Sequence, residues 1–114
     1  MNPKPGQVWL ADLGLAAKTR PVVIVSRFNP DPPRSLVVYV PLTTQGRGSS
    51  YEVEIPRQGF LSAPSVANVQ GIGSIPSIRL ERKLGVLSNE TMAEVRRTLS
   101  FALDITAPDE RQQS

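Results

Sequence analysis

The sequence contains neither cysteine nor histidine. Without cysteine, the chain can form neither a disulfide framework nor a thiolate metal site. Without histidine, it lacks the commonest general base and the commonest zinc ligand. Any chemistry must therefore use arginine, lysine, carboxylates, hydroxyls or amides, and we expect no metal and no other cofactor.

Long apolar runs and paired acidic motifs are also missing. No run of 18 or more apolar residues is present, and residues 1–7 are polar and proline-rich, so we expect a cytoplasmic protein that does not enter a membrane. Asp12, Glu52, Glu54 and Glu81 show no spacing typical of metal or glycosidase sites. Glu52 and Glu54 lie two residues apart and should share the solvent-exposed face of a strand.

Chain length and charge narrow the field further. With 114 residues the chain has room for one domain with a modest core. Its net charge of +3 and pI near 9.8 weakly favour an anionic partner. We expect a single domain over residues 1–105, followed by a polar tail over residues 106–114.

Short β-branched segments alternate with proline, glycine, asparagine and aspartate, which is typical of an all-β domain. We expect strands at residues 7–13, 21–27, 36–42, 51–55 and 65–70. The proline-rich segment 29–33 should be a surface turn, and residues 45–50 a flexible loop. Residues 71–74 should form a bend or bulge, and residues 78–81 a short helical turn or strand.

The last part of the domain has a helical pattern. From residue 88 onward, apolar residues recur at steps of three and four, which predicts one amphipathic helix. Its apolar face comprises Met92, Val95, Leu99, Ala102 and Leu103, whereas Glu94, Arg96 and Arg97 should face solvent. Ser88 or Asn89 is expected to cap the helix N-terminus.

Two short motifs suggest a site built from strand ends. Arg20 precedes Pro21 and a buried apolar run, which places a guanidinium at the start of a strand, where its planar fork can bind two phosphate oxygens. Thr43 and Thr44 end another apolar strand, and a threonine hydroxyl can donate to a phosphate oxygen as charge develops there. Taken alone, Arg20 is better explained as a surface residue that happens to start a strand, and Thr43 and Thr44 as strand-end residues that bond local backbone.

The remaining basic and aromatic residues have plain structural explanations. Each of the other basic side chains, taken singly, is typical of a solvated surface. If several lined one groove, they would follow a nucleic-acid backbone, and binding would weaken steeply with salt. These residues are Lys18, Arg47, Arg57, Arg79, Arg82 and Lys83. Trp9 and Phe101 are expected in the core, because their neighbours follow strand and helix periodicities.

The ordered set of motifs resembles the MazF/PemK toxins. The resemblance extends from about residue 4 to residue 105 and rests on these segments: Gly6-Gln7-Val8-Trp9, Arg20-Pro21-Val22-Val23-Ile24-Val25-Ser26, Val40-Pro41-Leu42-Thr43-Thr44, Glu52-Val53, Gln70, Arg79-Leu80 and the terminal helix. It implies a mainly β fold with a C-terminal α-helix, an SH3-like barrel of the CcdB/PemK type that forms a homodimer. It also implies a toxin of a type II toxin–antitoxin module, with an acidic cognate antitoxin as partner.

The activity implied by the resemblance is sequence-specific, metal-independent cleavage of single-stranded RNA. In this family the ribose 2′-hydroxyl attacks the adjacent phosphate and leaves 2′,3′-cyclic phosphate and 5′-hydroxyl ends. Arg20 and Thr43 fall at the positions of the catalytic arginine and threonine. RNA contacts are assigned to Lys18, Thr44, Gln45, Arg47, Gln70 and Arg79. Relatives often carry an acidic or polar residue before the arginine, but residues 14–19 include no carboxylate, so the general base has no candidate.

Two other functions fit the same fold class. One is a non-catalytic toxin that binds DNA gyrase, as CcdB does, and the other is an SH3-like interaction module. Arg20 and Thr43 at neighbouring strand ends favour the nuclease, because a gyrase-binding toxin acts through its C-terminal residues and needs neither. Fold alone does not separate the three.

Overall fold

The computed structural model describes residues 2–15 and 18–105, without the side chains of Leu15 and Lys18. In this part of the chain, short apolar segments form seven strands. The strands are β1 (Gln7–Leu15), β2 (Lys18–Ile24), β3 (Leu36–Thr43), β4 (Glu52–Ile55), β5 (Ser65–Asn68), β6 (Gly73–Pro76) and β7 (Leu80–Val86). The helical elements are η1 (Val69–Gly71), η2 (Ser77–Arg79) and α1 (Asn89–Ala102). The predicted fold class, mainly β with one C-terminal helix, is confirmed.

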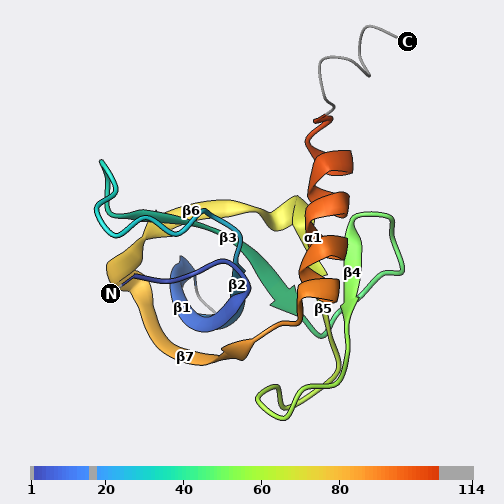
Figure 1. Ribbon diagram of the computed structural model, residues 1–114. Coiled ribbons are helices and arrows are strands. Elements are labelled where there is room, and N and C mark those ends of the chain that lie inside the picture. The colour runs from blue at the N-terminus through green and yellow to red at the C-terminus, as the bar shows by residue number, and fades with distance from the viewer. Residues whose placement is uncertain (1, 16–17, 106–114) are drawn as a thin grey trace, which may run out of the picture.

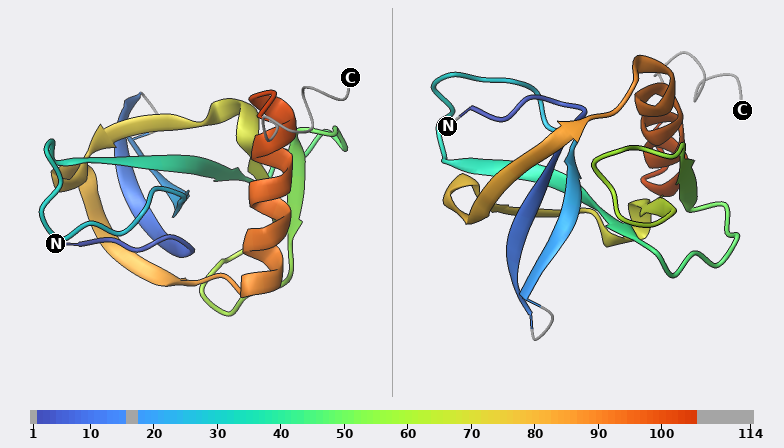
Figure 2. Two further views of the ribbon diagram at one scale, coloured as in Figure 1. Left: turned by 45° about the horizontal axis from the view of Figure 1, so that its top comes forward. Right: turned by 90° about the horizontal axis from the view of Figure 1, so that it is seen from below.

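All strand pairs are antiparallel, and the sheet runs in the order β4-β5-β3-β2-β1-β7, with β6 added to β3. The sheet curls strongly, and α1 packs beside β4 at one side of the curl (Figure 1). The β1–β2 hairpin extends away from the rest of the sheet (Figure 2). This arrangement is consistent with an SH3-like barrel. Because β2 and β3 are antiparallel, it brings the start of β2, where Arg20 lies, next to the end of β3, where Thr43 lies.

The curled sheet encloses two apolar clusters. One lies inside the curl and is built on Ala11, Val22 and Ile24, with Trp9 packed against it. The other lies between the sheet and α1 and includes Val23, Val40 and Val95. Successive residues of β2 therefore point to opposite clusters, so its continuous apolar run is buried on both faces. Among the described residues, no helix is both long and apolar enough to cross a membrane.

The strands predicted from sequence are found, with differences at their ends. β2 begins earlier than expected, at Lys18, because Lys18 pairs with Leu15 of β1. It ends earlier, at Ile24, since the Ser26 hydroxyl takes the place of a backbone acceptor and receives the Val38 N–H at 3.1 Å. β5 stops at Asn68, whose side chain accepts the Gln70 N–H and starts η1.

Two strands were missed or misjudged. Residues 73–76, expected to continue a bend, form β6 against β3, where the ring of Tyr39 covers Gly73. Residues 80–86 form β7, although only residues 78–81 were considered as a short turn or strand. The exposed run Glu81-Arg82-Lys83 hides the strand in the sequence, because it interrupts the apolar alternation that identifies strands.

The predicted helix and its cap are confirmed. Ser88 accepts the Thr91 N–H, and Met92 and Val95 are buried as expected. Two residues assigned to apolar packing are exposed, Phe101 at 59% and Leu103 at 48%. Phe101 packs against the ring of Tyr51, with centroids 5.3 Å apart. The proposed tail, residues 106–114, lies outside the described residues.

Candidate functional site

Arg20 and Thr43 line the same surface hollow, of about 400 Å³. We call it the Arg20–Thr43 hollow. Its polar side chains are Arg20, Thr43, Thr44, Ser62, Ser65 and Arg82. Its apolar residues are Leu10, Pro21, Leu42, Phe60, Leu61, Ala63 and Leu84. A pocket with an apolar floor and a few convergent polar groups is the usual form of a binding site.

The register of β2 and β3 explains why Arg20 and Thr43 meet. Val22 pairs with Pro41, so the same register continued by two residues sets Arg20 opposite Thr43. Directly opposite residues of an antiparallel pair project to the same face. Pro21 cannot donate to a ladder, and the β2–β3 ladder begins only after it, at Val22. The pairing of β2 with β3 therefore stops short of Arg20, at the hollow that Arg20 and Thr43 line.

Both side chains keep groups available for an anion. Arg20 is exposed, and in the described part of the chain it has neither an ion pair nor a hydrogen-bonded acceptor. Thr43 Oγ1 accepts the Gln45 N–H at 3.0 Å, which orients the hydroxyl and leaves its proton free to donate. A guanidinium with free N–H groups beside an oriented hydroxyl can bind a phosphate and stabilise charge that develops on it.

The residues assigned to RNA contacts are only partly brought together. Thr44 lines the Arg20–Thr43 hollow, whereas Gln45, Arg47, Gln70 and Arg79 do not. Gln45 and Arg47 lie in the adjacent β3–β4 loop, and Gln70 lies in η1. Arg79 forms an ion pair with Asp12, in which Nη1 of Arg79 lies 3.8 Å from Oδ1 of Asp12. Lys18 lies in β2, but its side chain is outside the described part.

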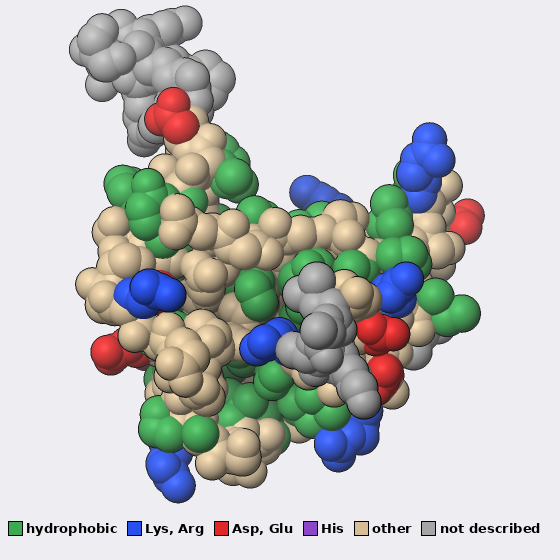
Figure 3. Space-filling view, turned by 180° about the vertical axis from the view of Figure 1, so that it is seen from behind, with side chains coloured by type: hydrophobic (Ala, Val, Ile, Leu, Met, Phe, Trp, Pro, Cys, Tyr) green, Lys and Arg blue, Asp and Glu red, His purple; other side chains and the backbone are tan. Residues whose placement is uncertain are grey.

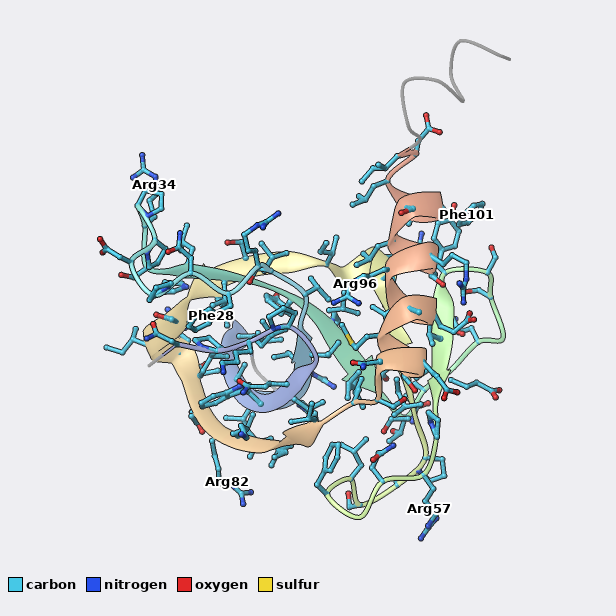
Figure 4. The ribbon with its side chains drawn as sticks, viewed as in Figure 1. Phe28, Arg34, Arg57, Arg82, Arg96 and Phe101 are labelled. Atoms are coloured by element: carbon cyan, nitrogen blue, oxygen red, sulfur yellow. The ribbon has the colours of Figure 1, made fainter. Side chains whose placement is uncertain are left out.

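Sequence analysis missed Arg82 and the loop between β4 and β5 as parts of the hollow. Arg82 pairs with Leu10, which pairs on its other side with Pro21, so the three residues form one row across the sheet. Arg82 projects outward from β7 in Figure 4. Because β7 itself was not recognised, the sequence offered no reason to place Arg82 beside Arg20.

Two further hollows adjoin the first on the side of β4 and β5. The nearer one, of about 350 Å³, shares Thr43, Thr44 and Ser65 with it and also contains Glu54; we call it the Glu54 hollow. The next, of about 400 Å³, contains both Glu52 and Glu54. These two glutamates share one face, as predicted. Glu54 is exposed to solvent there, and the face lines the hollows beside the Arg20–Thr43 hollow.

Glu52 organises the β3–β4 loop. Its carboxylate accepts the Arg47 N–H at 2.9 and 3.1 Å and the Ser49 N–H at 3.1 Å. Gly48, between them, has φ of 65°, a conformation that glycine adopts without strain. Hydrogen bonds from the backbone N–H groups of Ser49 and Arg47 are the main causes that lower the pKa of Glu52. Desolvation opposes them, and the Gly48 backbone and the charge of Arg47 lower the pKa further.

Positive charge is distributed rather than concentrated. Lys and Arg side chains are spread over the face shown in Figure 3, separated by hydrophobic and uncharged surface. Another hollow, of about 250 Å³, lies by the β2–β3 loop and contains Arg27 and Asp31 but none of the expected site residues. Among the described residues, no group of three or more acidic side chains gathers as a metal cluster would.

Comparison with known proteins gives a consistent result. Residues 4–103 match the family described as PemK-like, MazF-like toxin of type II toxin-antitoxin system. The chain is 31% identical over 88 residues to endoribonuclease MazF3 of Mycobacterium tuberculosis, covering 77% of this chain and 85% of that one. It is 29% identical over 103 residues to the probable endoribonuclease MazF5 of the same organism, covering 90% and 94%.

The fold agrees with solved structures. An endoribonuclease in complex with its cognate antitoxin, from a Mycobacterial species, superposes with a TM-score of 0.80 at 29% identity. The similarity covers 93% of this chain and 99% of that one.

Proposed function

The chain belongs to the PemK-like, MazF-like family of toxins of type II toxin–antitoxin systems, and we propose that it is a sequence-specific endoribonuclease that cuts single-stranded RNA without a metal ion. The observation that carries the proposal is the shared hollow of Arg20 and Thr43. The names of the similar Mycobacterium tuberculosis proteins support RNA cleavage over gyrase binding or a simple interaction module.

In the proposed mechanism, the scissile phosphate lies between Arg20 and Thr43. The ribose 2′-oxygen forms a bond to phosphorus, the bond from phosphorus to the 5′-oxygen breaks, and the products carry a 2′,3′-cyclic phosphate and a 5′-hydroxyl. Arg20 neutralises charge on the pentacoordinate phosphorus and supplies a proton to the leaving oxygen. Thr43 donates a hydrogen bond to a non-bridging oxygen, where negative charge increases in the transition state.

RNA outside the reacting phosphate would follow the adjoining hollows. Thr44 and Arg82 line the same hollow as Arg20, and the β3–β4 loop carries Gln45 and Arg47 beside it. Gln70 and Arg79 lie outside the Arg20–Thr43 hollow. We propose that they contact RNA that extends beyond the hollows. Lys18, two residues before Arg20 in the chain, is proposed to contact RNA as well.

The proposed partners follow from the family. We propose that the protein works in the cytoplasm, where its RNA substrate is, and that it acts as a homodimer controlled by an acidic antitoxin. A solved relative is described in complex with its cognate antitoxin. The net charge of +3 favours an acidic partner that folds as it binds.

The test is incubation of purified protein with a long single-stranded RNA in EDTA. Wild type should produce discrete cuts with 5′-hydroxyl ends, and Arg20→Ala should lower the rate by on the order of 10²–10³. Arg57→Ala is the matched control, because Arg57 projects away from the sheet in the β4–β5 loop and does not line the hollow (Figure 4). Intact RNA with wild type would favour the gyrase-binding or interaction-module alternatives.

A further inference from the structure

We propose that Glu54 is the general base of the cleavage reaction, which takes the proton from the attacking 2′-hydroxyl. This inference rests on the proposed function. It addresses the chemical role for which the sequence offered no residue, since residues 14–19 before Arg20 contain no carboxylate.

Sheet register places Glu54 in the same row as Thr43. Val66 of β5 pairs with Thr43 on one side and with Glu54 on the other. Directly paired residues share a face, so the side chains of Thr43, Val66 and Glu54 project in the same direction. With neighbouring strands a little under 5 Å apart, the Cα atoms of Thr43 and Glu54 are about 10 Å apart.

This spacing suits a nucleotide. A phosphate bound by Arg20 and Thr43 leaves room over Val66 for the ribose on its 5′ side, and the long side chain of Glu54 can extend toward that ribose. Thr43, Val66 and Glu54 all line the Glu54 hollow, so the path between them is open. The register of β2 and β3, when continued, adds Arg20 to the other end of the same row.

The state of the Glu54 carboxylate also fits a base. Within the described residues Glu54 has no hydrogen-bond or ion-pair partner, so its lone pairs are available to a ligand. Glu52, which lies on the same face, accepts the backbone N–H groups of Arg47 and Ser49 instead. A carboxylate stabilised in this way is a weaker base, and its lone pairs are engaged.

Other carboxylates are less suitable. Asp12 is paired with Arg79 and accepts the Gly14 N–H, and it does not line the hollow. Glu81 precedes Arg82 on β7, so the two side chains point to opposite faces, and Arg82 is the one that lines the hollow. Glu81 is therefore a matched control for an exposed strand carboxylate.

In the step itself, the Glu54 carboxylate accepts the 2′-hydroxyl proton while the 2′-oxygen bonds to phosphorus. The 5′-oxygen leaves as the hydroxyl of the downstream fragment, with its proton supplied at Arg20. The protonated Glu54 then returns its proton to solvent, and Arg20 regains a proton from solvent, so both groups are reset for the next turnover. General base catalysis of this kind contributes roughly 10²–10⁴ in rate.

The experiment compares single-turnover cleavage rates with binding to an RNA whose reacting 2′-hydroxyl is replaced by hydrogen. Glu54→Gln should cut at least about 10²-fold more slowly than wild type while binding this RNA equally well. Added formate should restore part of the rate to Glu54→Ala but none to Arg20→Ala. Glu81→Gln should cleave as wild type does.

The outcomes separate this inference from the proposed function. If wild type cleaves, Arg20→Ala does not, and Glu54→Gln cleaves at the wild-type rate, then the nuclease assignment stands and Glu54 is not the base. Weakened RNA binding by Glu54→Gln, or a slow Glu54→Ala that formate does not rescue, would also overturn the role. Absence of cleavage by wild type would contradict the proposed function itself.

Discussion

Thr43 combines a structural and a proposed chemical role in one hydroxyl group. Its oxygen accepts the Gln45 N–H, and its proton is directed toward the Arg20–Thr43 hollow in our proposal. Thr43→Val removes both with little change in shape and should slow cleavage by on the order of 10²-fold or more. Thr43→Ser keeps the hydroxyl and should retain most activity. Single-turnover rates on one RNA measure both variants, and equal rates for wild type and Thr43→Val would refute the role.

Glu52 should make the β3–β4 loop sensitive to acid. Its pKa is lowered in the folded protein, chiefly by the Ser49 and Arg47 backbone N–H groups. Its stabilising effect is therefore complete above the ordinary glutamate value of about 4.3 and disappears as pH falls through the lower, folded-state value. We expect the Tm difference between wild type and Glu52→Gln to be largest near neutral pH and to shrink below about pH 4. A pH-independent difference would contradict this origin.

Sequence could identify some site residues and not others, for physical reasons. Arg20 directly precedes Pro21 and an apolar run, and Thr43 ends the apolar strand that contains Pro41, so both could be placed at strand ends and their meeting predicted. Glu54 alternates with apolar residues on a strand, and that pattern alone indicates only a solvent-exposed face. Its position beside Thr43 depends on pairing through Val66, which is separated from both in sequence.

At the scale of elements, α1 depends on its N-terminal cap. Ser88 Oγ accepts the Thr91 N–H at 3.1 Å, which satisfies a backbone donor at the helix start. Ser88→Ala should lower the free energy of unfolding by about 1 kcal/mol. Ser100→Ala, at an exposed helical position, should have no such cost. Urea unfolding of the two variants checks the difference, and equal stabilities would show that the cap contributes nothing.

β7 and the β4–β5 loop are held together by a close contact at Gly85. A Cβ at Gly85 would lie 2.3 Å from the ring of Phe60, which lines the Arg20–Thr43 hollow. Gly85→Ala should therefore displace Phe60, lower the free energy of unfolding by about 1–3 kcal/mol and slow cleavage. Gly59→Ala is the control, since its Cβ would meet nothing within 4 Å.

A double variant tests the cause of that effect. Adding Phe60→Ala to Gly85→Ala should remove the clash, so the two changes in unfolding free energy should be less than additive. Strict additivity would show that Gly85→Ala acts through something other than the Phe60 ring.

The elements that sequence predicted best are those whose periodicity is not interrupted. β3 and α1 have regular apolar patterns. β3 was placed within one residue of its observed ends, and α1 within one residue of its observed start. β7 was missed because Glu81, Arg82 and Lys83 are all exposed, so no apolar alternation marks this part of the strand. β6 was missed because it begins at a glycine and ends at a proline, which usually indicate turns.

At the scale of the whole molecule, a modest positive charge is spread over the surface. Binding of RNA should therefore depend on salt through a small number of phosphate contacts. The affinity for a non-cleavable RNA should fall linearly with the logarithm of salt concentration, and Arg82→Ala should make this slope shallower by about one. Fluorescence anisotropy at several salt concentrations measures the slope, and an unchanged slope would place Arg82 away from the RNA.

The central claim is that the ribose 2′-hydroxyl performs the attack at a site formed by Arg20 and Thr43. The most direct test uses an RNA with two mapped cleavage sites, one of which carries a single 2′-deoxy nucleotide on the 5′ side of the scissile phosphate. We predict that wild type, in EDTA, cuts the unmodified site at its normal rate and leaves the modified site intact. Cleavage at the modified site would contradict the account.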